Sequence, residues 1–527
     1  MPRYQINLFI MMVTIIFFAG CKKEENTSWD SDLVIPLAYG SVGIGDIVAD
    51  SLIVADDNQL WHLMLNENLT DFDLDSLVSM PDTVIRESFV VPIIGGPFPI
   101  PNGQEIINQE ENNLIRVNNV ELREVIVESG TMEYSIKSYI NGYLTCTYEI
   151  PGVSLNDESV VIQTTTQPSD GTIPYAYHGS IDLSGYTFDL TGATGFMFNR
   201  MYTHLTISTA VDAPTQALIS GNDSVVVELK FVDPVIKYAR GFFGEQHYVL
   251  DESIDFSDNI DFPSGLLNLD QVVMNFNLTN YVGADARIHF SSLYDFNSET
   301  NAQVELAHGP LYQPINLTRA YDQNGTVVPT QVSFEMNHSN SNIDEFLENL
   351  PNLIHLDADV TINPLGDVSD GNDFVYTAQT LDAEMTLDVP LNIGMYNLRF
   401  VDTLNIGSTV ELAADGHLYL KVDNWFPFTA TCDAFLINEN GYLINMICKN
   451  QSIQSATETS VAGVTIPSHS VIDVSVNETL INAFNPDHQI VIRLTLNTPD
   501  VNIPTGLYTP YKMEFQVIAD GAVTLEY

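Results

Sequence analysis

An alternation of apolar and polar residues recurs along most of this chain and constrains its fold more than any other feature. In residues 416–425, for example, Leu418, Leu420 and Val422 share one face of an extended segment, while polar residues take the other. Turn-forming pairs separate such runs: Asp170-Gly171, Asn324-Gly325, Asn440-Gly441 and Asp520-Gly521. This pattern predicts an all-β protein of tandem antiparallel β-sandwich-like units, with one or two short helices.

The clearest exception to the strand pattern is a short helix predicted over residues 342–350. Asn342 and Glu345 have the spacing of a capping box, and Pro351 ends the run. The apolar residues that would share its buried face are Ile343, Phe346, Leu347 and Leu350. Residues 44–49 are a second helix candidate, which Gly43 and Gly45 weaken.

A chain of 527 residues with 45% hydrophobic content can bury several cores. Three segments, 130–139, 270–281 and 416–425, resemble one another, since each alternates and then ends in a polar residue followed by an aromatic one. Their spacing of about 140 residues suits repeated sandwich units. The predicted division is a leader over 1–20, a tether over 21–28, an N-terminal β region over 29–110, and β units over 111–250, 251–412 and 413–527.

The last of these copies supports a family resemblance. The strand ending in Asn424-Trp425-Phe426-Pro427-Phe428, followed by a hairpin that closes on Gly441, resembles the water-stress and late-embryogenesis-abundant-like sandwich domains. In that family an Asn, a Pro and an aromatic residue follow the strand, whereas here two aromatic residues separate Asn424 from Pro427. The resemblance covers about thirty residues and implies a seven- or eight-stranded antiparallel sandwich.

The N-terminus has the features of a lipoprotein leader. Arg3 precedes an apolar run over residues 6–18, which is too short to span a bilayer but suits a secretory signal. Phe18-Ala19-Gly20-Cys21 resembles the lipobox of bacterial lipoproteins. The resemblance implies cleavage before Cys21, a diacylglyceryl group on its sulfur and an acyl chain such as palmitate on its amine; more than one chain makes a stable anchor.

The residues after Cys21 bear on the compartment. Lys22, Lys23, Glu24 and Glu25 resemble the surface-export signal of Bacteroidota lipoproteins, which implies an outer-membrane location facing the medium. A solvated charged tether in a periplasm-facing lipoprotein would have the same sequence features. The Trp29-Asp30 and Pro36-Leu37 pairs also resemble the start of uncharacterised flavobacterial-type outer-membrane lipoproteins, to which no activity is attached.

Charge limits the choice of partners. Acids outnumber bases 69 to 18, which gives a formal net charge of -51. Such a field repels phosphate backbones, so nucleic-acid binding is excluded. The remaining partners are neutral, such as glycans and protein edges, or cationic, such as calcium. Acidity that only keeps an exposed protein soluble is the simpler reading.

Beyond Cys21 the chain has three cysteines. Two apolar runs flank Glu439-Asn440-Gly441 and predict a hairpin; pairing Asn438 with Tyr442 places Cys432 directly opposite Cys448, at a separation that a disulfide bridges. A slipped register and two buried free thiols are the alternatives. Cys146 has no evident partner and is expected to be a small buried residue.

The sequence holds no nucleophile elbow, HExxH motif or phosphate-cradling loop, and its histidines form no i, i+2 or i+4 pairs, so we expect no enzymatic activity. A glycosidase carboxylate pair assembled by folding stays open. We expect no cofactor, with calcium as the exception: Asp367, Asp370, Asn372 and Asp373 crowd one loop, which is otherwise a plain polar loop. Trp425 and Phe426 form either a ligand platform or part of the core.

These observations favour a lipid-anchored, non-enzymatic protein that is attached to a membrane through Cys21 and acts by binding, either as an adhesion or structural module or as an accessory subunit of an outer-membrane complex. Two alternatives remain. A glycan-capture lipoprotein of a nutrient importer would show a groove with exposed aromatic side chains. A lipid-binding β-roll would show a continuous apolar tunnel.

Overall fold

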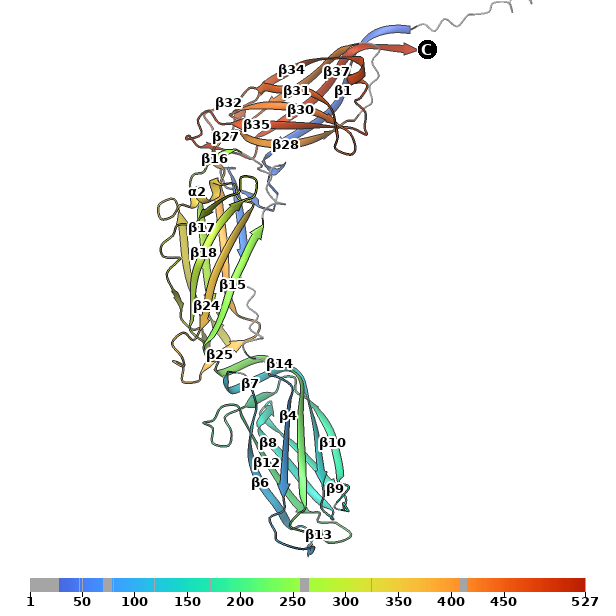
Figure 1. Cartoon of the computed structure of the whole chain (residues 1–527), viewed down its shortest axis with the longest axis vertical. Coiled ribbons are helices and arrows are strands. Elements are labelled where there is room, and N and C mark those ends of the chain that lie inside the picture. The colour runs from blue at the N-terminus through green and yellow to red at the C-terminus, as the bar shows by residue number, and fades with distance from the viewer. Residues whose placement is uncertain are drawn as a thin grey trace, which may run out of the picture.

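The computed structural model describes residues 28–526, except 47, 50, 70–77, 79, 118, 171, 256–264, 324 and 408–414. In this part of the chain, antiparallel sheets form three bodies arranged one after another along an elongated molecule (Figure 1). We call them the terminal sandwich, the middle sandwich and the tip domain. The all-β prediction of tandem sandwich-like units is confirmed. No helix among the described residues is long and apolar enough to cross a membrane.

The terminal sandwich packs two four-stranded sheets face to face. Strand alternation places Leu418, Leu420 and Val422 in the core, as the sequence pattern predicts. In strand order, the first sheet is β1 (Ser28–Gly43), β37 (Lys512–Glu526), β29 (Gly416–Asn424) and β34 (Ser468–Val476). The second is β28 (Leu398–Asn405), β35 (Gln489–Asn497), β30 (Thr429–Ile437) and β31 (Leu443–Ile453).

The middle sandwich has the same two-layer plan. Phe276 of one sheet meets Phe290 of the other, with ring centroids 5.7 Å apart. One sheet is β2 (Ile53–Ala55), β3 (Trp61–Asn68), β26 (Leu381–Pro390), β17 (Val273–Asn280) and β23 (Thr330–Asn337). The other is β15 (Gln246–Asp255), β24 (Leu353–Ile362), β18 (Ala286–Asn297) and β19 (Ala302–Glu305), with β20 (Ile315–Leu317) also on β18.

The tip domain lies at the far end from the C-terminus (Figure 1) and is formed by one large sheet folded around its own core. Phe188 and Phe231 meet edge to face inside it. The main path is β14 (Ser224–Phe242), β7 (Glu121–Ser138), β11 (Thr187–Asp189), β8 (Leu144–Leu155), β12 (Arg200–Thr209) and β6 (Glu105–Leu114). Further strands are β4 (Thr83–Val90), β9 (Glu158–Thr166) and β10 (Tyr175–Asp182), with the short pair β5 (Phe98–Ile100) and β13 (Ala217–Ile219).

Smaller elements complete the bodies and their junctions. β25 (Asp373–Tyr376) leaves the middle sandwich and pairs with β14 of the tip domain. The others are β16 (Leu266–Asn268), β27 (Asn392–Tyr396) and β36 (Thr505–Gly506) in one sheet, and the pairs β21 (Tyr321–Gln323) with β22 (Thr326–Val328) and β32 (Thr457–Glu458) with β33 (Thr465–Ile466).

The segment 29–110 contributes strands to all three bodies. β1 pairs with β37 in the terminal sandwich, β3 pairs with β26 in the middle sandwich, and β4 pairs with β14 in the tip domain. The chain therefore runs outward to the tip domain first and then returns. Both ends of the described chain lie together at the outer end of the terminal sandwich (Figure 1).

Helices are few and short. The helix α2 (Ile343–Glu348) lies inside the predicted range 342–350, and its residues Ile343, Phe346 and Leu347 are buried. The predicted capping box is wrong, because the Asn342 side chain makes no cap hydrogen bond; it accepts from the Ala307 amide and donates to the Glu305 carbonyl instead. The other helices are η1 (Ile44–Asp46), a single 3₁₀ turn, and α3 (Glu478–Ile481).

Two of the three similar sequence segments end in the same structural arrangement around an asparagine. In the middle sandwich, the buried Asn280 amide donates to the Ala284 and Thr318 carbonyls at 2.9 and 3.0 Å. In the terminal sandwich, buried Asn424 donates to the Phe428 and Gln454 carbonyls at 3.1 and 2.8 Å. Each side chain also accepts from the amide two residues later. The conserved geometry shows that this asparagine shapes the turn between two strands.

Candidate functional site

The predicted anchor and export residues lie outside the described residues. Cys21, Lys22, Lys23, Glu24 and Glu25 all precede Ser28, where the described chain begins. The lipidation prediction therefore stays a prediction.

Phe426 is part of a core, so of the two readings of Trp425 and Phe426 the core reading holds for this residue. Its side chain is 3% exposed, stacks on Phe428 with centroids 5.0 Å apart and meets Tyr511 edge to face. The Trp425 ring is half-buried, and the Lys512 ammonium lies 5.2 Å from its centroid. A ring with one face already taken by a cation offers little room for a sugar.

The loop with Asp367, Asp370, Asn372 and Asp373 does not gather its oxygens as a calcium site requires. Asp367 accepts from the Gly371 amide, and Asn372 accepts from Arg240 of the tip domain. Buried Asp373 accepts from Asn363 at 2.7 Å and from Arg319 at 3.4 Å. Burial raises the pKa of the Asp373 carboxyl, which these donors oppose. In the described part of the chain, these three aspartates do not come together as one group of carboxylates, which favours the plain polar loop over a calcium site. Of these side chains, Asn372 joins the loop to the tip domain through its bond with Arg240.

The hairpin around Asn440 forms as predicted, but its register differs. The Asn438 amide donates to the Tyr442 carbonyl, and bulges then shift the pairing so that Cys448 lies opposite Ala434. Cys432 and Cys448 are free and buried, and so is Cys146. The prediction that Cys432 lies directly opposite Cys448 is wrong, although the two thiols interact; that contact and burial raise the pKa of Cys432.

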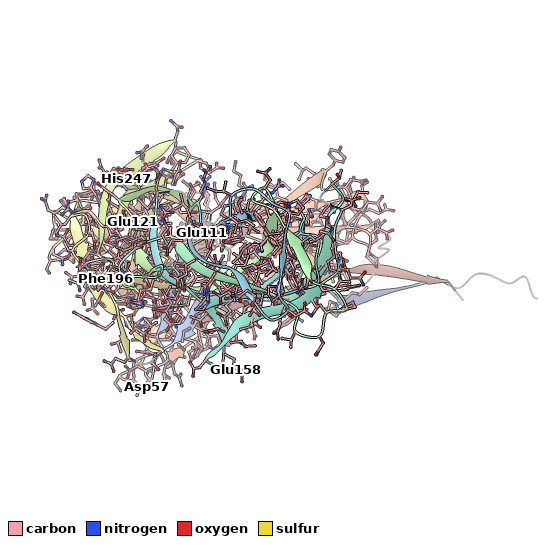
Figure 2. All side chains as sticks on the ribbon, turned by 90° about the horizontal axis from the view of Figure 1, so that it is seen from below. Asp57, Glu111, Glu121, Glu158, Phe196 and His247 are labelled. Atoms are coloured by element: carbon pink, nitrogen blue, oxygen red, sulfur yellow. The ribbon has the colours of Figure 1, made fainter. Side chains whose placement is uncertain are left out.

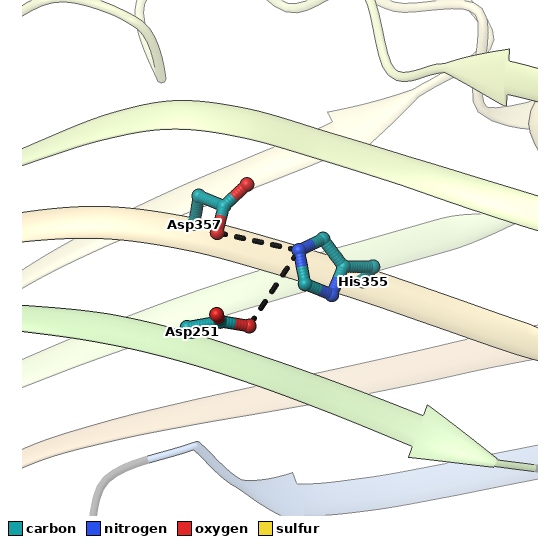
Figure 3. A group of neighbouring side chains, drawn as sticks. All are labelled: Asp251, His355 and Asp357. Atoms are coloured by element: carbon teal, nitrogen blue, oxygen red, sulfur yellow. Dashed lines mark ion pairs between the residues drawn. The ribbon is translucent and has the colours of Figure 1, made fainter.

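One group of side chains in the described structure is close enough to ligate a metal: Asp251 on β15, with His355 and Asp357 on β24 (Figure 3). His355 Nε2 lies 3.2 Å from an Asp357 oxygen and 3.7 Å from an Asp251 oxygen. Sequence reasoning missed the group, because it looked only for histidines paired with one another and these are absent. His355 and Asp357 do have an i, i+2 spacing, but Asp251 reaches them only through strand pairing.

A second feature is the group of loops that closes the far end of the tip domain. Hydrogen bonds and β-pairing join the loops 91–104, 139–143, 167–174 and 210–223 to one another. They carry five exposed large apolar side chains: Ile94 at 98%, Val211 at 74%, Ile173 at 71%, Phe98 at 48% and Leu218 at 41%. We call this set the tip patch. These loops contain three charged residues, Asp170, Asp212 and Asp223, and no basic residue.

The loops that carry the tip patch are held in defined conformations. Asp170 accepts from the Thr172 and Ile173 amides at 2.8 and 2.7 Å, which fixes Ile173 and lowers the pKa of the aspartate. Asn102 donates to the Ala213 carbonyl at 2.8 Å and so joins two loops. A Cβ on Gly221 would lie 2.1 Å from the Ile93 carbonyl oxygen, so this contact requires glycine. The tip patch is therefore preorganised.

Acidic side chains surround the sides of the tip domain. Figure 2, seen from the tip end, labels Glu111, Glu121 and Glu158, which are all exposed. Phe196, also labelled in that view, is 87% exposed on a separate loop between β11 and β12. The tip patch is thus an apolar area whose loops carry only acidic charges, as most of the molecule does.

Two hollows bear on the alternative functions. An apolar cavity between the sheets of the terminal sandwich, lined by Val42, Phe400 and Phe428, has a volume of about 30 Å³, close to that of one water molecule. An acyl chain does not fit there. A surface hollow of about 330 Å³ between residues 458–464 and 499–511 has Tyr508 in its wall and the exposed side chains of Val461 and Ile503 at its rim.

Comparison with known proteins leaves the site without a precedent. No protein-family model matches the chain, and no curated protein matches it. A solved structure from Parabacteroides distasonis ATCC 8503, provisionally described as a secreted protein, aligns over 93% of this chain and 99% of its own, with 10% identity and a TM-score of 0.29. The cowpea mosaic virus top component aligns over 62% of this chain and 94% of its own, with 9% identity and a TM-score of 0.18. Similarities at this level assign neither a family nor a function.

Proposed function

We propose that this chain is a lipid-anchored, non-enzymatic binding protein that presents the tip patch to a protein partner. The observation that carries the proposal is the position of the two ends. The two ends of the described chain, Ser28 and Glu526, pair with each other at one end of the molecule, and the tip-domain strands β5 and β13 lie at the other (Figure 1). A lipid at the N-terminus would therefore place the tip patch at the membrane-distal end.

The tether sets how close the body lies to the bilayer. Six residues lie between Cys21 and Ser28, where β1 begins, so the two are seven residue steps apart. A fully extended segment of this length spans about 25 Å. The terminal sandwich would then lie next to the membrane, and the outward order of bodies would be terminal sandwich, middle sandwich and tip domain. The charged residues Lys22 to Glu25 support export to the face of the outer membrane that meets the medium.

The chemistry of the tip patch selects the partner class. Exposed apolar side chains held in a defined arrangement are typical of protein-binding surfaces. The net charge of -51 disfavours anionic headgroups and nucleic acid. A partner protein subunit with an apolar recess fits the patch, in agreement with a role as an accessory subunit of an outer-membrane complex.

Co-purification from detergent-solubilised native membranes tests this proposal. We expect a stoichiometric protein partner with the unaltered chain and its loss with Ile94→Asp. Burying one large apolar side chain contributes about 1.5–3 kcal/mol, so the variant should weaken binding about 10- to 100-fold. Val471→Asp is the matched control, because Val471 is 60% exposed on the terminal sandwich. Equal partner recovery by Ile94→Asp and the unaltered chain would refute the role of the tip patch.

The anchor is tested separately. Cys21→Ala should release the protein from the membrane fraction while leaving its fold and its affinity for the partner unchanged. A Cys21→Ala chain that stays acylated and membrane-bound would contradict the anchor without affecting the tip patch.

Glycan capture is the second candidate, and the surface hollow beside Tyr508 favours it. An aromatic side chain at the wall of a hollow is a usual contact for a sugar ring. Retention of polysaccharide by the purified protein, abolished by Tyr508→Ala and unaffected by Ile94→Asp, would support glycan capture over the tip-patch proposal.

A further inference from the structure

We propose that Asp251, His355 and Asp357 bind one divalent transition-metal ion, with Zn²⁺ as the best match. This inference goes beyond the proposed function and does not depend on it. The three side chains share the solvent-facing side of the sheet that contains β15, β24 and β18, and their ligand atoms all lie within 4.8 Å of one another (Figure 3). One imidazole nitrogen and two carboxylate oxygens form an accepted zinc donor set, with a fourth position left for water.

Strand pairing brings the ligands together. Asp251 lies directly opposite Asp357 across the antiparallel ladder, and His355 is two residues from Asp357, so all three side chains project from one face. His355 Nε2 points between the two carboxylates, as Figure 3 shows. Exposure falls from 73% for Asp251 to 37% for Asp357 and 15% for His355. The imidazole is therefore the fixed part of the site, and Asp251 is the ligand on its solvent-exposed side.

Neighbouring side chains hold two of the three ligands in position. The Ser253 hydroxyl lies 2.8 Å from His355 Nδ1, which leaves Nε2 free to face the carboxylates. The Tyr294 ring packs against the imidazole, with centroids 4.8 Å apart. The Ser292 hydroxyl donates to Asp357 Oδ2 at 3.0 Å, so the other oxygen of that carboxylate faces His355. Such outer contacts around ligands orient them and strengthen metal binding.

This group differs from the other histidine–carboxylate pairs in the number of carboxylates that face the histidine. His417 with Asp473 and His469 with Asp423 are one-to-one pairs on the terminal sandwich, at 2.7 and 2.6 Å. His355 instead faces two carboxylates, and among the described residues neither one forms an ion pair with lysine or arginine. A divalent cation would neutralise both carboxylates, whereas a protonated imidazole would neutralise one.

The metal would also join an edge strand to its sheet. β15 is the outer strand in the order β15-β24-β18-β19, and the proposed site takes one ligand from β15 and two from β24. A ligand that binds only the folded state stabilises it. Zn²⁺ should therefore raise the melting temperature of the protein and slow amide exchange along β15.

Isothermal titration of Zn²⁺ into the purified, chelator-treated full-length chain tests the proposal. We expect one Zn²⁺ per chain, with loss of that site in both His355→Gln and Asp251→Asn. Because the Asp251 side chain is largely exposed, Asp251→Asn should keep the fold. This variant therefore tests the site even if His355→Gln fails to fold. His417→Gln is the matched control and should keep the site.

Ser253→Ala tests the positioning of the imidazole. It removes no metal ligand, and loss of an orienting contact of this kind weakens metal binding about 10- to 100-fold. Absence of Zn²⁺ uptake by the unaltered chain, or full retention of the site in either His355→Gln or Asp251→Asn, would overturn the proposal and leave the group as an ion-paired cluster.

Discussion

Replacing the buried Asp295 with asparagine should stabilise the middle sandwich at neutral pH. Asp295 on β18 is 0% exposed. Its Oδ1 accepts from the Val304 amide at 3.0 Å and from the Asn349 side chain at 2.7 Å. Its Oδ2 is buried and has no hydrogen-bond partner in the described structure. Asparagine can keep both bonds to Oδ1 while removing the buried charge, whose desolvation is unfavourable.

The pKa of Asp295 sets the size and the sign of this effect. Burial raises its pKa from 3.8 to about 6, against the opposing bonds from Asn349 and Val304. Because the folded pKa lies above the unfolded one, the folded state holds the proton more strongly. The free energy of unfolding therefore falls as pH rises from about 4 to about 6, by about 3 kcal/mol from this group, and is flat on either side. Asp295→Asn removes this dependence.

Urea denaturation between about pH 4 and pH 7, with hydrogen exchange of β18 peptides as the local readout, measures the effect. The unfolding free energy of Asp295→Asn relative to the unaltered chain should rise by about 3 kcal/mol across this interval. Asp359→Asn is the matched control, because it removes one charge from an exposed position on β24 and should change little at any pH. A pH-independent difference for Asp295→Asn would refute the reasoning.

Three further outcomes are expected. Asn424→Ala removes three hydrogen bonds in a buried turn and should lower the unfolding free energy by about 3 kcal/mol in urea denaturation, whereas the exposed Asn440→Ala should change little. Burial raises the pKa of Glu87, so Glu87→Gln should gain stability relative to the unaltered chain as pH rises above about 4.5. Melting temperatures of the two proteins measured over this pH range would show the gain. Melting temperatures that differ by the same amount at every pH would contradict it. The contact between Cys432 and Cys448 predicts that diamide oxidises the two thiols to one disulfide, seen as a linked peptide in non-reducing mass spectrometry; separate peptides would contradict the contact.

Local pattern predicted the strands and the main helix because each depends on residues close in sequence. Leu418 and Leu420 are buried as their alternation predicts, and α2 falls within residues 342–350. The side-chain roles of Asn342 and Phe426 were not predictable in this way. Asn342 bonds to the backbone around β19, more than thirty residues away, and Phe426 packs on Tyr511, which directly precedes β37.

The candidate metal site shows the same limit more sharply. His355 and Asp357 are visible in the sequence as neighbours on one strand face, but Asp251 lies more than a hundred residues earlier. Only the register between β15 and β24 brings Asp251 opposite Asp357, and a shift by one residue would turn it to the other face. Clusters made by register are therefore invisible to spacing rules, whereas the loop from Asp367 to Asp373 is visibly crowded with polar residues in the sequence, and its Asn372 bonds to Arg240 of the tip domain.

The path of the chain explains how three bodies in a row can keep the tip patch in a fixed orientation. The backbone passes outward through the middle sandwich to the tip domain and later returns to the terminal sandwich, so each junction is crossed twice. At the tip domain, β25 also pairs with β14, and Arg240 bonds to Glu124 at 2.8 Å and to Asn372 across the junction. Two crossings with a shared ladder restrict rotation more than a single linker would. Restricting the motion of a flexible surface when a partner binds costs entropy. Because the junctions already restrict the rotation of the tip domain, the tip patch loses less entropy on binding a partner.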